Sequence, residues 1–430
     1  MPEPDIRAEA EVRLWGATVG ALVELGNGRV IFEYADSFRR GGLEISPIHL
    51  PTDQRGPVSF DELRSLDAFE GLPGVFADAL PDAFGRRVIR AFYAARGETE
   101  SALSPVQRLL YVGERAIGAL TFHPTEEIPS RSAERESLDL QKLAQDAQRI
   151  VRGDAAIEIP EIYRIGSSAG GRRPKAIVHY HPEQRTIRSG GMPPVAGEIP
   201  CILKFDGVGD GATEDDLGRP MHYNRVEAAY GEMARAAGLE TPAIHVLEVD
   251  GYAHLLIERF DVRNGRSLHQ HTLGGMLHVD YNQPHGSSYE EYFRTVLRLG
   301  MAYDALTEAY RRSAFNVMTV NQDDHVKNLS FHMDSEGAWS LSPAYDLTFA
   351  HGAGFTATHQ MTVRDKDTGI GEADLLELAR EFGVKRPDRI LEHMRHAVAG
   401  WERCAANYDV PDQVVKAIRK ELDAYPRDSV

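Results

Sequence analysis

The stretch NQDDHVKNLSF, from Asn321 to Phe331, is the most informative segment of this 430-residue chain. It places Asp323 and Asn328 five positions apart, and Asp346 follows in SPAYDLTFA. The residues between them, Leu329 to Leu341, alternate like a β-hairpin with a DSEG turn. Because an antiparallel hairpin returns the chain to its starting point, the sequence predicts that Asp346 lies close to Asn328.

Three such side chains suit phosphoryl transfer from ATP. That reaction needs an Asp that orients the acceptor hydroxyl and receives its proton. It also needs an Asn and a second Asp whose oxygens hold Mg²⁺ against the phosphates. The D-x-x-x-x-N spacing of Asp323 and Asn328 is that of the kinase catalytic loop, with Asp346 as the second Asp. The segment alone leaves an alternative open, in which Asp323 and Asp324 form an N-cap or a solvated turn.

Further pieces of an ATP site precede this segment in the order that a kinase requires. The loop GSSAGG, residues 166–171, offers backbone N–H groups to phosphate. Lys204 is central in the apolar strand CILKF, and Glu227, on a predicted helix over 224–237, is its expected counter-ion. The strand HLLIERF ends at Phe260, where a hinge would meet adenine. Taken singly, each piece has an alternative: Lys204 could be an exposed lysine of an edge strand, and GSSAGG could be a plain turn.

The order of predicted elements favours an α+β fold. Residues 1–125 begin with a β-meander and continue with a helical stretch from about 60 to 95. The polar segment 126–137 predicts a linker. Residues 138–262 read as a mixed lobe with the glycine-rich loop and the hinge, and residues 263–430 as a mostly helical lobe with the catalytic loop.

Composition excludes several classes of protein. With 48 Lys and Arg against 65 Asp and Glu, the net charge of −17 disfavours a stand-alone nucleic-acid binder. It is compatible with a basic protein partner or a metal-nucleotide site. No apolar run approaches the roughly 18 residues of a membrane span, and the acidic N-terminus lacks the features of a signal peptide. Two cysteines, Cys201 and Cys404, favour a reducing cytoplasm.

With these residues in place, the chain resembles the HipA family of bacterial serine/threonine kinase toxins. The resemblance runs nearly end to end and includes the family's extra N-terminal subdomain. The D-x-H-x-K-N string is its most specific motif. The matching segments are FADALPDAFG (76–85), VGERAIGALTFHP (112–124), SSAGGRRPKA (167–176), ILKF (202–205), NRVEAAY (224–230), LIERFD (256–261), DDHVKN (323–328) and PAYDL (343–347).

The resemblance implies a protein-kinase-like bilobal fold, with ATP and Mg²⁺ as cofactors. It implies that Asp323 is the catalytic aspartate and that Asn328 and Asp346 hold Mg²⁺. A serine of the glycine-rich loop would be autophosphorylated, which is Ser168, or Ser167 if the register slips by one residue. The remaining nucleotide-binding positions are Ala169, Gly170, Gly171, Lys175, Lys204, Glu258, Arg259, Phe260, His325, Lys327 and Asn328.

The resemblance also implies a function. Relatives phosphorylate a cellular protein, an aminoacyl-tRNA synthetase, and so stall translation and growth. They pair with a small helix-turn-helix antitoxin, HipB-like, and reach DNA only through it. Two alternatives remain open: a binding or co-repressor role in which catalysis is secondary, and a small-molecule phosphotransferase.

Some features depart from the expected pattern or mimic others. Asp346 precedes Leu-Thr rather than Phe-Gly, so a kinase-type DFG flip is not assumed. Asp324 stands where a small residue is common, and it either adds a ligand or faces water. The histidines of segment 268–286 fit no standard zinc spacing, which favours structural or substrate-contacting roles. DAFG at Asp82 is interpreted as a helix C-cap.

Overall fold

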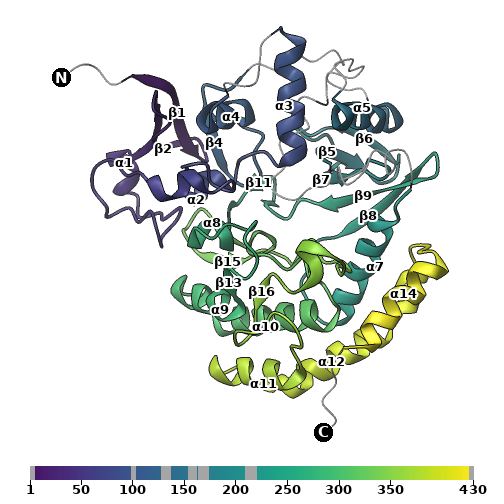
Figure 1. Ribbon diagram of the computed structural model, residues 1–430. Helices are drawn as coiled ribbons and strands as arrows, with labels where there is room; N and C mark the ends of the chain where they lie inside the picture. Colours follow the sequence, from purple (N-terminus) through teal and green to yellow (C-terminus); the bar gives the residue numbers. More distant parts are fainter. Residues whose placement is uncertain are drawn as a thin grey trace. The chain divides into compact units, whose positions relative to one another are not determined.

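The computed structural model describes residues 5–97, 103–126, 137–153, 162, 174–208 and 220–425 (Figure 1). Its contacts divide the chain into two compact units. Unit 1 comprises Met1–Met221, His245–His271 and Asp334–Gly337, and unit 2 comprises His222–Ile244, Thr272–Met333 and Ala338–Val430. The two units are interleaved along the sequence.

Unit 1 begins with the predicted β-meander, now seen as part of a four-stranded antiparallel sheet. The order of its strands is β3-β2-β1-β4. Alternate residues of β1, from Ala8 to Leu14, are buried, as expected for a strand with one face on a core. The strand bounds are β1 (Ile6–Leu14), β2 (Ala17–Leu25), β3 (Val30–Tyr34) and β4 (Leu120–His123).

The helical stretch predicted over 60–95 is interrupted in the structure. Pro73 and Pro81 each lack a backbone donor, which explains why the chain forms short helices there instead of one long helix. Asp82 is the N-cap of α3, because its carboxylate accepts a hydrogen bond from Gly85 N at 2.7 Å. The interpretation of Asp82 as a C-cap was therefore wrong. The helices are α1 (Asp36–Arg39), η1 (Asp61–Ser65), α2 (Gly74–Ala77), α3 (Ala83–Ala95) and α4 (Pro105–Val112).

This cap leads to a prediction for stability. Asp82→Ala should lower the free energy of unfolding by about 1 kcal/mol, because a buried backbone N–H loses its acceptor. Asp82→Asn should retain most of the stability, since Asn caps helices about as well as Asp. Denaturant unfolding of the three proteins checks this, and equal losses in both variants would contradict the N-cap assignment.

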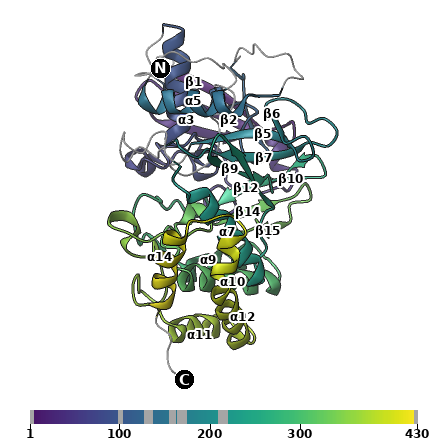
Figure 2. The same cartoon turned by 90° about the vertical axis from the view of Figure 1, so that its right-hand side faces the viewer.

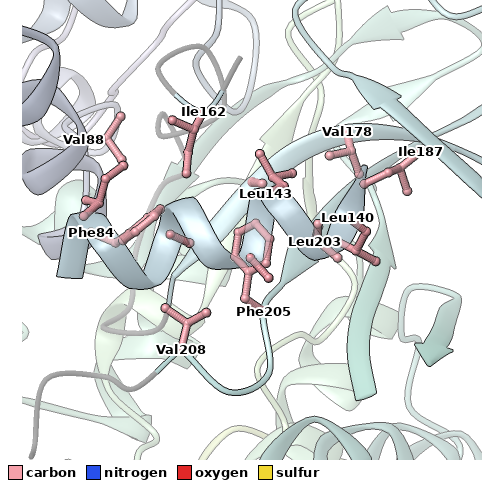
Figure 3. Packing of buried hydrophobic residues seen from close by; sticks show 14 of the residues in the cluster. Phe84, Val88, Leu140, Leu143, Ile162, Val178, Ile187, Leu203, Phe205 and Val208 are labelled. Atoms are coloured by element: carbon pink, nitrogen blue, oxygen red, sulfur yellow. The ribbon is translucent and has the colours of Figure 1, made fainter. Parts of the chain in front are cut away.

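The second sheet of unit 1 has five strands in the order β6-β5-β7-β9-β8. Its core face packs against α5 and against α3 from the first 125 residues, as the cluster of Phe84, Val88, Leu143 and Leu203 shows (Figure 3). The two predicted N-terminal parts therefore share one hydrophobic core. The elements are α5 (Leu140–Arg152), β5 (Lys175–His181), β6 (Thr186–Ser189), β7 (Ile199–Lys204), β8 (Ile244–Val249) and β9 (Tyr252–Glu258).

Unit 2 is mostly helical (Figure 2). Its core includes Tyr230, whose ring lies 5.4 Å from that of Trp401 and 6.3 Å from that of Phe315. The Tyr230 hydroxyl donates to the Thr319 carbonyl at 2.9 Å, so the buried phenol has a partner. The helices are α7 (Tyr223–Ala236), α8 (Leu273–Leu277), α9 (Tyr289–Arg298), α10 (Tyr303–Met318), α11 (Glu372–Glu381), α12 (Pro387–Ala399), α13 (Trp401–Ala406) and α14 (Asp412–Asp423).

Short elements complete the two units. They are β10 (Val262–Arg263), β11 (Arg266–Ser267), β12 (His269–Thr272), β13 (Ser287–Ser288), η4 (Val326–Asn328), β14 (Ser330–Met333), β15 (Trp339–Leu341), η5 (Gly354–Ala357) and β16 (Met361–Thr362). None of the helices in the described part of the chain has the length and apolar character that a membrane span requires.

Candidate active site

The segment that carries the D-x-x-x-x-N motif is a closed loop between α10 and β14. Asn328, at the end of η4, donates its side-chain N–H to the Asp323 carbonyl at 2.9 Å. This bond orients the amide so that the Asn328 carbonyl oxygen points away from the loop backbone. The Asp323 side chain is 44 % exposed, so its carboxylate is accessible to a ligand.

The hairpin returns the chain to this loop, as its pattern predicts. In β14 and β15, Phe331 pairs with Leu341 and Met333 with Trp339. Beyond β15, the Tyr345 hydroxyl donates to the Lys327 carbonyl at 2.7 Å, which fixes the residue before Asp346 beside the residue before Asn328.

Asp346 itself adopts an unusual backbone conformation. Its φ of 52° lies in the left-handed region, which non-glycine residues seldom occupy except Asn, Asp and His. Such conformations persist where the surrounding structure holds them, and they gather at functional sites.

His325 is a buried residue of this loop. Burial lowers the pKa of His325, while Asp323 and Asp346 act on it in the opposite direction. The imidazole is therefore favoured as the neutral form, and its Nε2 lies 3.9 Å from Asp323 Oδ1. Beside it, Lys327 Nζ lies 5.0 Å from the centre of the Tyr281 ring, a cation–π contact.

The sequence leaves two expectations for Asp324, that it adds a ligand or that it faces water. In the structure the residue is buried, and both of its carboxylate oxygens accept hydrogen bonds from other parts of the protein. Its side chain is fully buried. Oδ2 accepts from the Tyr289 hydroxyl and from His359 Nδ1, both at 2.9 Å, and Oδ1 accepts from Gln360 N at 2.7 Å. The network continues from Tyr289 to Asn316. These partners were missed because they lie 8 to 36 positions from Asp324 and carry no motif.

In unit 1, the structure places two predicted phosphate-binding lysines opposite each other. Lys175 pairs with Lys204 across β5 and β7, and both are buried. Residues directly opposite in an antiparallel pair point to the same face of the sheet. Since their neighbours Ala176 and Leu203 lie in the hydrophobic core, alternation puts both lysines on the other face.

The predicted hinge lies at the end of β9. Glu258 Oε1 is 2.8 Å from His245 Nε2. The Arg259 guanidinium pairs with Asp261, and its backbone N–H donates to the Pro200 carbonyl at 2.8 Å. Arg259 is thus used within the sheet, through its backbone and its side chain.

Two of the predicted features stay predictions. Lys204 belongs to unit 1 and Glu227, which is buried on α7, belongs to unit 2, so their pairing is not described. The glycine-rich loop, with Ser167, Ser168, Ala169, Gly170 and Gly171, lies outside the described residues.

The histidines of segment 268–286 have structural partners. His269 Nε2 is 2.8 Å from the Ile45 carbonyl, and His271 lies between Ser46 and Asp78. His285 contacts Thr358 Oγ1 at 2.9 Å. Among the residues that the structure describes, no group of three His, Cys, Asp or Glu side chains is arranged to hold a metal.

A unit built on two antiparallel sheets and a mostly helical unit define a protein of α+β fold. The family models agree with the sequence pattern. The model of the HipA N-terminal domain matches residues 10–123, and that of the HipA-like C-terminal domain matches residues 167–401. The chain belongs to the HipA family.

Two individual proteins are similar to the chain over nearly its whole length. Y4dM of Sinorhizobium fredii, whose name assigns it provisionally as a kinase, is 23 % identical to this chain. The alignment covers 95 % of each of the two chains. The HipA of Shewanella oneidensis, solved with HipB and its operator DNA, superimposes with a TM-score of 0.67 at 17 % identity. That comparison covers 97 % of this chain and 95 % of the other, and it bears on the fold.

Proposed function

We propose that this protein is an ATP-dependent serine/threonine protein kinase. The observation that supports the proposal is the loop in which Asn328 donates to the Asp323 carbonyl, together with the hydrogen bond from Tyr345, the residue before Asp346, to the Lys327 carbonyl of that loop. Asp323 is exposed there while its neighbour Asp324 is buried, so one carboxylate of the pair faces a ligand. The provisional naming of Y4dM as a kinase supports the same activity.

In this mechanism, Asp323 orients the hydroxyl of the acceptor residue and receives its proton as the phosphoryl group is transferred. Because His325 is buried and favours the neutral form, it adds no positive charge beside Asp323 and leaves that carboxylate as the proton acceptor. Lys327, a cation of the same loop, rests on the Tyr281 ring.

The donor set of the loop fits Mg²⁺. Asn328 presents an amide oxygen and Asp346 a carboxylate, and Mg²⁺ is commonly bound through one or two carboxylates together with substrate phosphates. When bound, the ion would neutralise charge on the phosphates. Asn328 and Asp346 would hold it.

Lys175 and Lys204 are proposed to contact the ATP phosphates. They lie directly opposite each other on β5 and β7, so both side chains point to the same face of the sheet. Two ammonium groups on one face are suited to contact a polyphosphate lying across the two strands. Glu258 and Phe260 are proposed to meet the adenine through their backbone.

We further propose that Ser168, or Ser167, is autophosphorylated. A phosphoserine carries nearly two negative charges, so it would repel the γ-phosphate of ATP from the same loop and shut off transfer. The cellular substrate is proposed, from the family resemblance, to be an aminoacyl-tRNA synthetase.

A second role, as the binding partner of a helix-turn-helix antitoxin, is favoured by the net charge of −17. The Shewanella HipA was solved with HipB and operator DNA, which supports a HipB-like partner for this chain. An acidic protein would reach DNA through such a basic partner rather than by itself. The two roles are compatible in one chain.

Incubation of the purified protein with γ-labelled ATP and Mg²⁺ tests the kinase proposal. We expect label on Ser167 or Ser168, mapped by mass spectrometry, and loss of that label in the Ser167→Ala/Ser168→Ala double variant. Chelation of Mg²⁺ is the control. If the wild type labels neither itself nor any protein of a bacterial lysate, it is not a protein kinase.

A further inference from the structure

We propose that Asp324 is the positioning residue of the active-site loop: it anchors the loop in the protein interior so that Asp323 is held facing the substrate. This inference rests on the proposed kinase function and extends it. It starts from the observation that two neighbouring aspartates have opposite surroundings, with exposures of 44 % for Asp323 and 0 % for Asp324.

The anchor joins three separate parts of unit 2. The Tyr289 hydroxyl comes from the first residue of α9, while His359 and Gln360 come from the chain after Asp346. A carboxylate that accepts three hydrogen bonds from such partners has one orientation. Buried charged hydrogen bonds of this kind are the strongest of those available to a side chain.

The orientation of Asp324 determines that of Asp323. The two residues share a peptide bond, and the Asp324 side chain is fully buried while that of Asp323 is 44 % exposed. A rotation of the loop that turned Asp323 away would have to break the buried hydrogen bonds of Asp324.

The segment that receives the anchor is itself fixed. The side chain of Gln360 donates to the Phe355 and Thr358 carbonyls, and its backbone carbonyl accepts from His285 N at 2.9 Å. The next residue, Met361, begins a parallel pairing of β16 with β13. Asp324 therefore connects the catalytic loop to a rigid part of the unit.

The chemistry of the site requires a carboxylate. Burial, together with the Asp324 charge, raises the pKa of Tyr289 well above its usual value, so the phenol remains a donor. Donors thus face both oxygens of Asp324. An Asn side chain has one acceptor oxygen and turns an N–H₂ group toward at least one of these donors.

The experiment compares kinetics and local dynamics in the full-length protein. Asp324→Asn should lower kcat on the order of 10- to 100-fold, because misplacement of a reacting group by about 1 Å costs that much. Its Kd for Mg-ATP should stay near that of the wild type, while its thermal midpoint should fall because a buried donor loses its acceptor. Hydrogen exchange at residues 351–363 should become faster.

Tyr289→Phe and Asp304→Asn complete the set. Tyr289→Phe removes one of the three donors and should lower kcat by less than Asp324→Asn, which keeps the test valid if Asp324→Asn fails to fold. Asp304 is an exposed aspartate in the first turn of α10, outside the anchored segment, so Asp304→Asn should leave kcat unchanged.

Three results would overturn the proposal. They are a folded Asp324→Asn protein with wild-type kcat and exchange, a Tyr289→Phe protein with wild-type kcat, and an equal loss of kcat in Asp304→Asn. Faster exchange in Asp324→Asn with no activity in the wild type would instead refute the kinase function while retaining the anchor.

Discussion

Asp323→Asn should lower the rate of phosphoryl transfer by a factor of about 10² to 10⁴, the usual contribution of a general base. The substitution keeps the size of the side chain and removes its ability to accept a proton. The Asp323 side chain is 44 % exposed, and the Asp323 backbone carbonyl accepts the hydrogen bond from Asn328, which the substitution leaves in place. We therefore expect the fold and the affinity for Mg-ATP to be retained.

The measurement is single-turnover transfer of label from ATP, with Kd for Mg-ATP determined separately. Asp304→Asn is a matched control, because Asp304 is an exposed aspartate in the first turn of α10. It should transfer at the wild-type rate. An Asp323→Asn protein as active as this control would remove Asp323 from catalysis and leave only the fold assignment standing.

The sequence predicts the loop because its information is local. Five positions separate Asp323 from Asn328, and a hairpin of regular alternation connects them to Asp346, so spacing and turn chemistry suffice. The role of Asp324 does not follow from the sequence. Its partners His359 and Gln360 lie about 35 residues further along, and only the tertiary fold places them around its carboxylate.

In the N-terminal region, too, the sequence does not predict which distant segments pack together. Alternation predicts the strands of the meander, but the pattern of apolar residues in α3 does not reveal which core they enter. Phe84 and Val88 pack with Leu143 and Leu203, which belong to a different part of the sequence. The helix boundaries also depend on Pro73 and Pro81, which interrupt the single helical stretch predicted over residues 60–95.

Asp346→Asn should raise the Mg²⁺ concentration required for half-maximal activity and lower the rate at low Mg²⁺ by about 10- to 100-fold. The order of magnitude is that seen when groups that support a bound metal are changed. Asn is the appropriate replacement because φ at Asp346 is 52°, a conformation that Asn tolerates and Ala does not. The change therefore removes a charge from the site without straining the backbone.

A Mg²⁺ titration of labelled-phosphate transfer distinguishes a metal ligand from a structural residue. If Asp346 holds the ion, raising Mg²⁺ should recover part of the lost activity in Asp346→Asn, because mass action compensates for weaker binding. Asp365→Asn is the control, since Asp365 is also an aspartate with positive φ but is exposed elsewhere in unit 2. A loss that no Mg²⁺ concentration relieves, accompanied by a lower thermal midpoint, would show that the charge of Asp346 supports the loop rather than the ion.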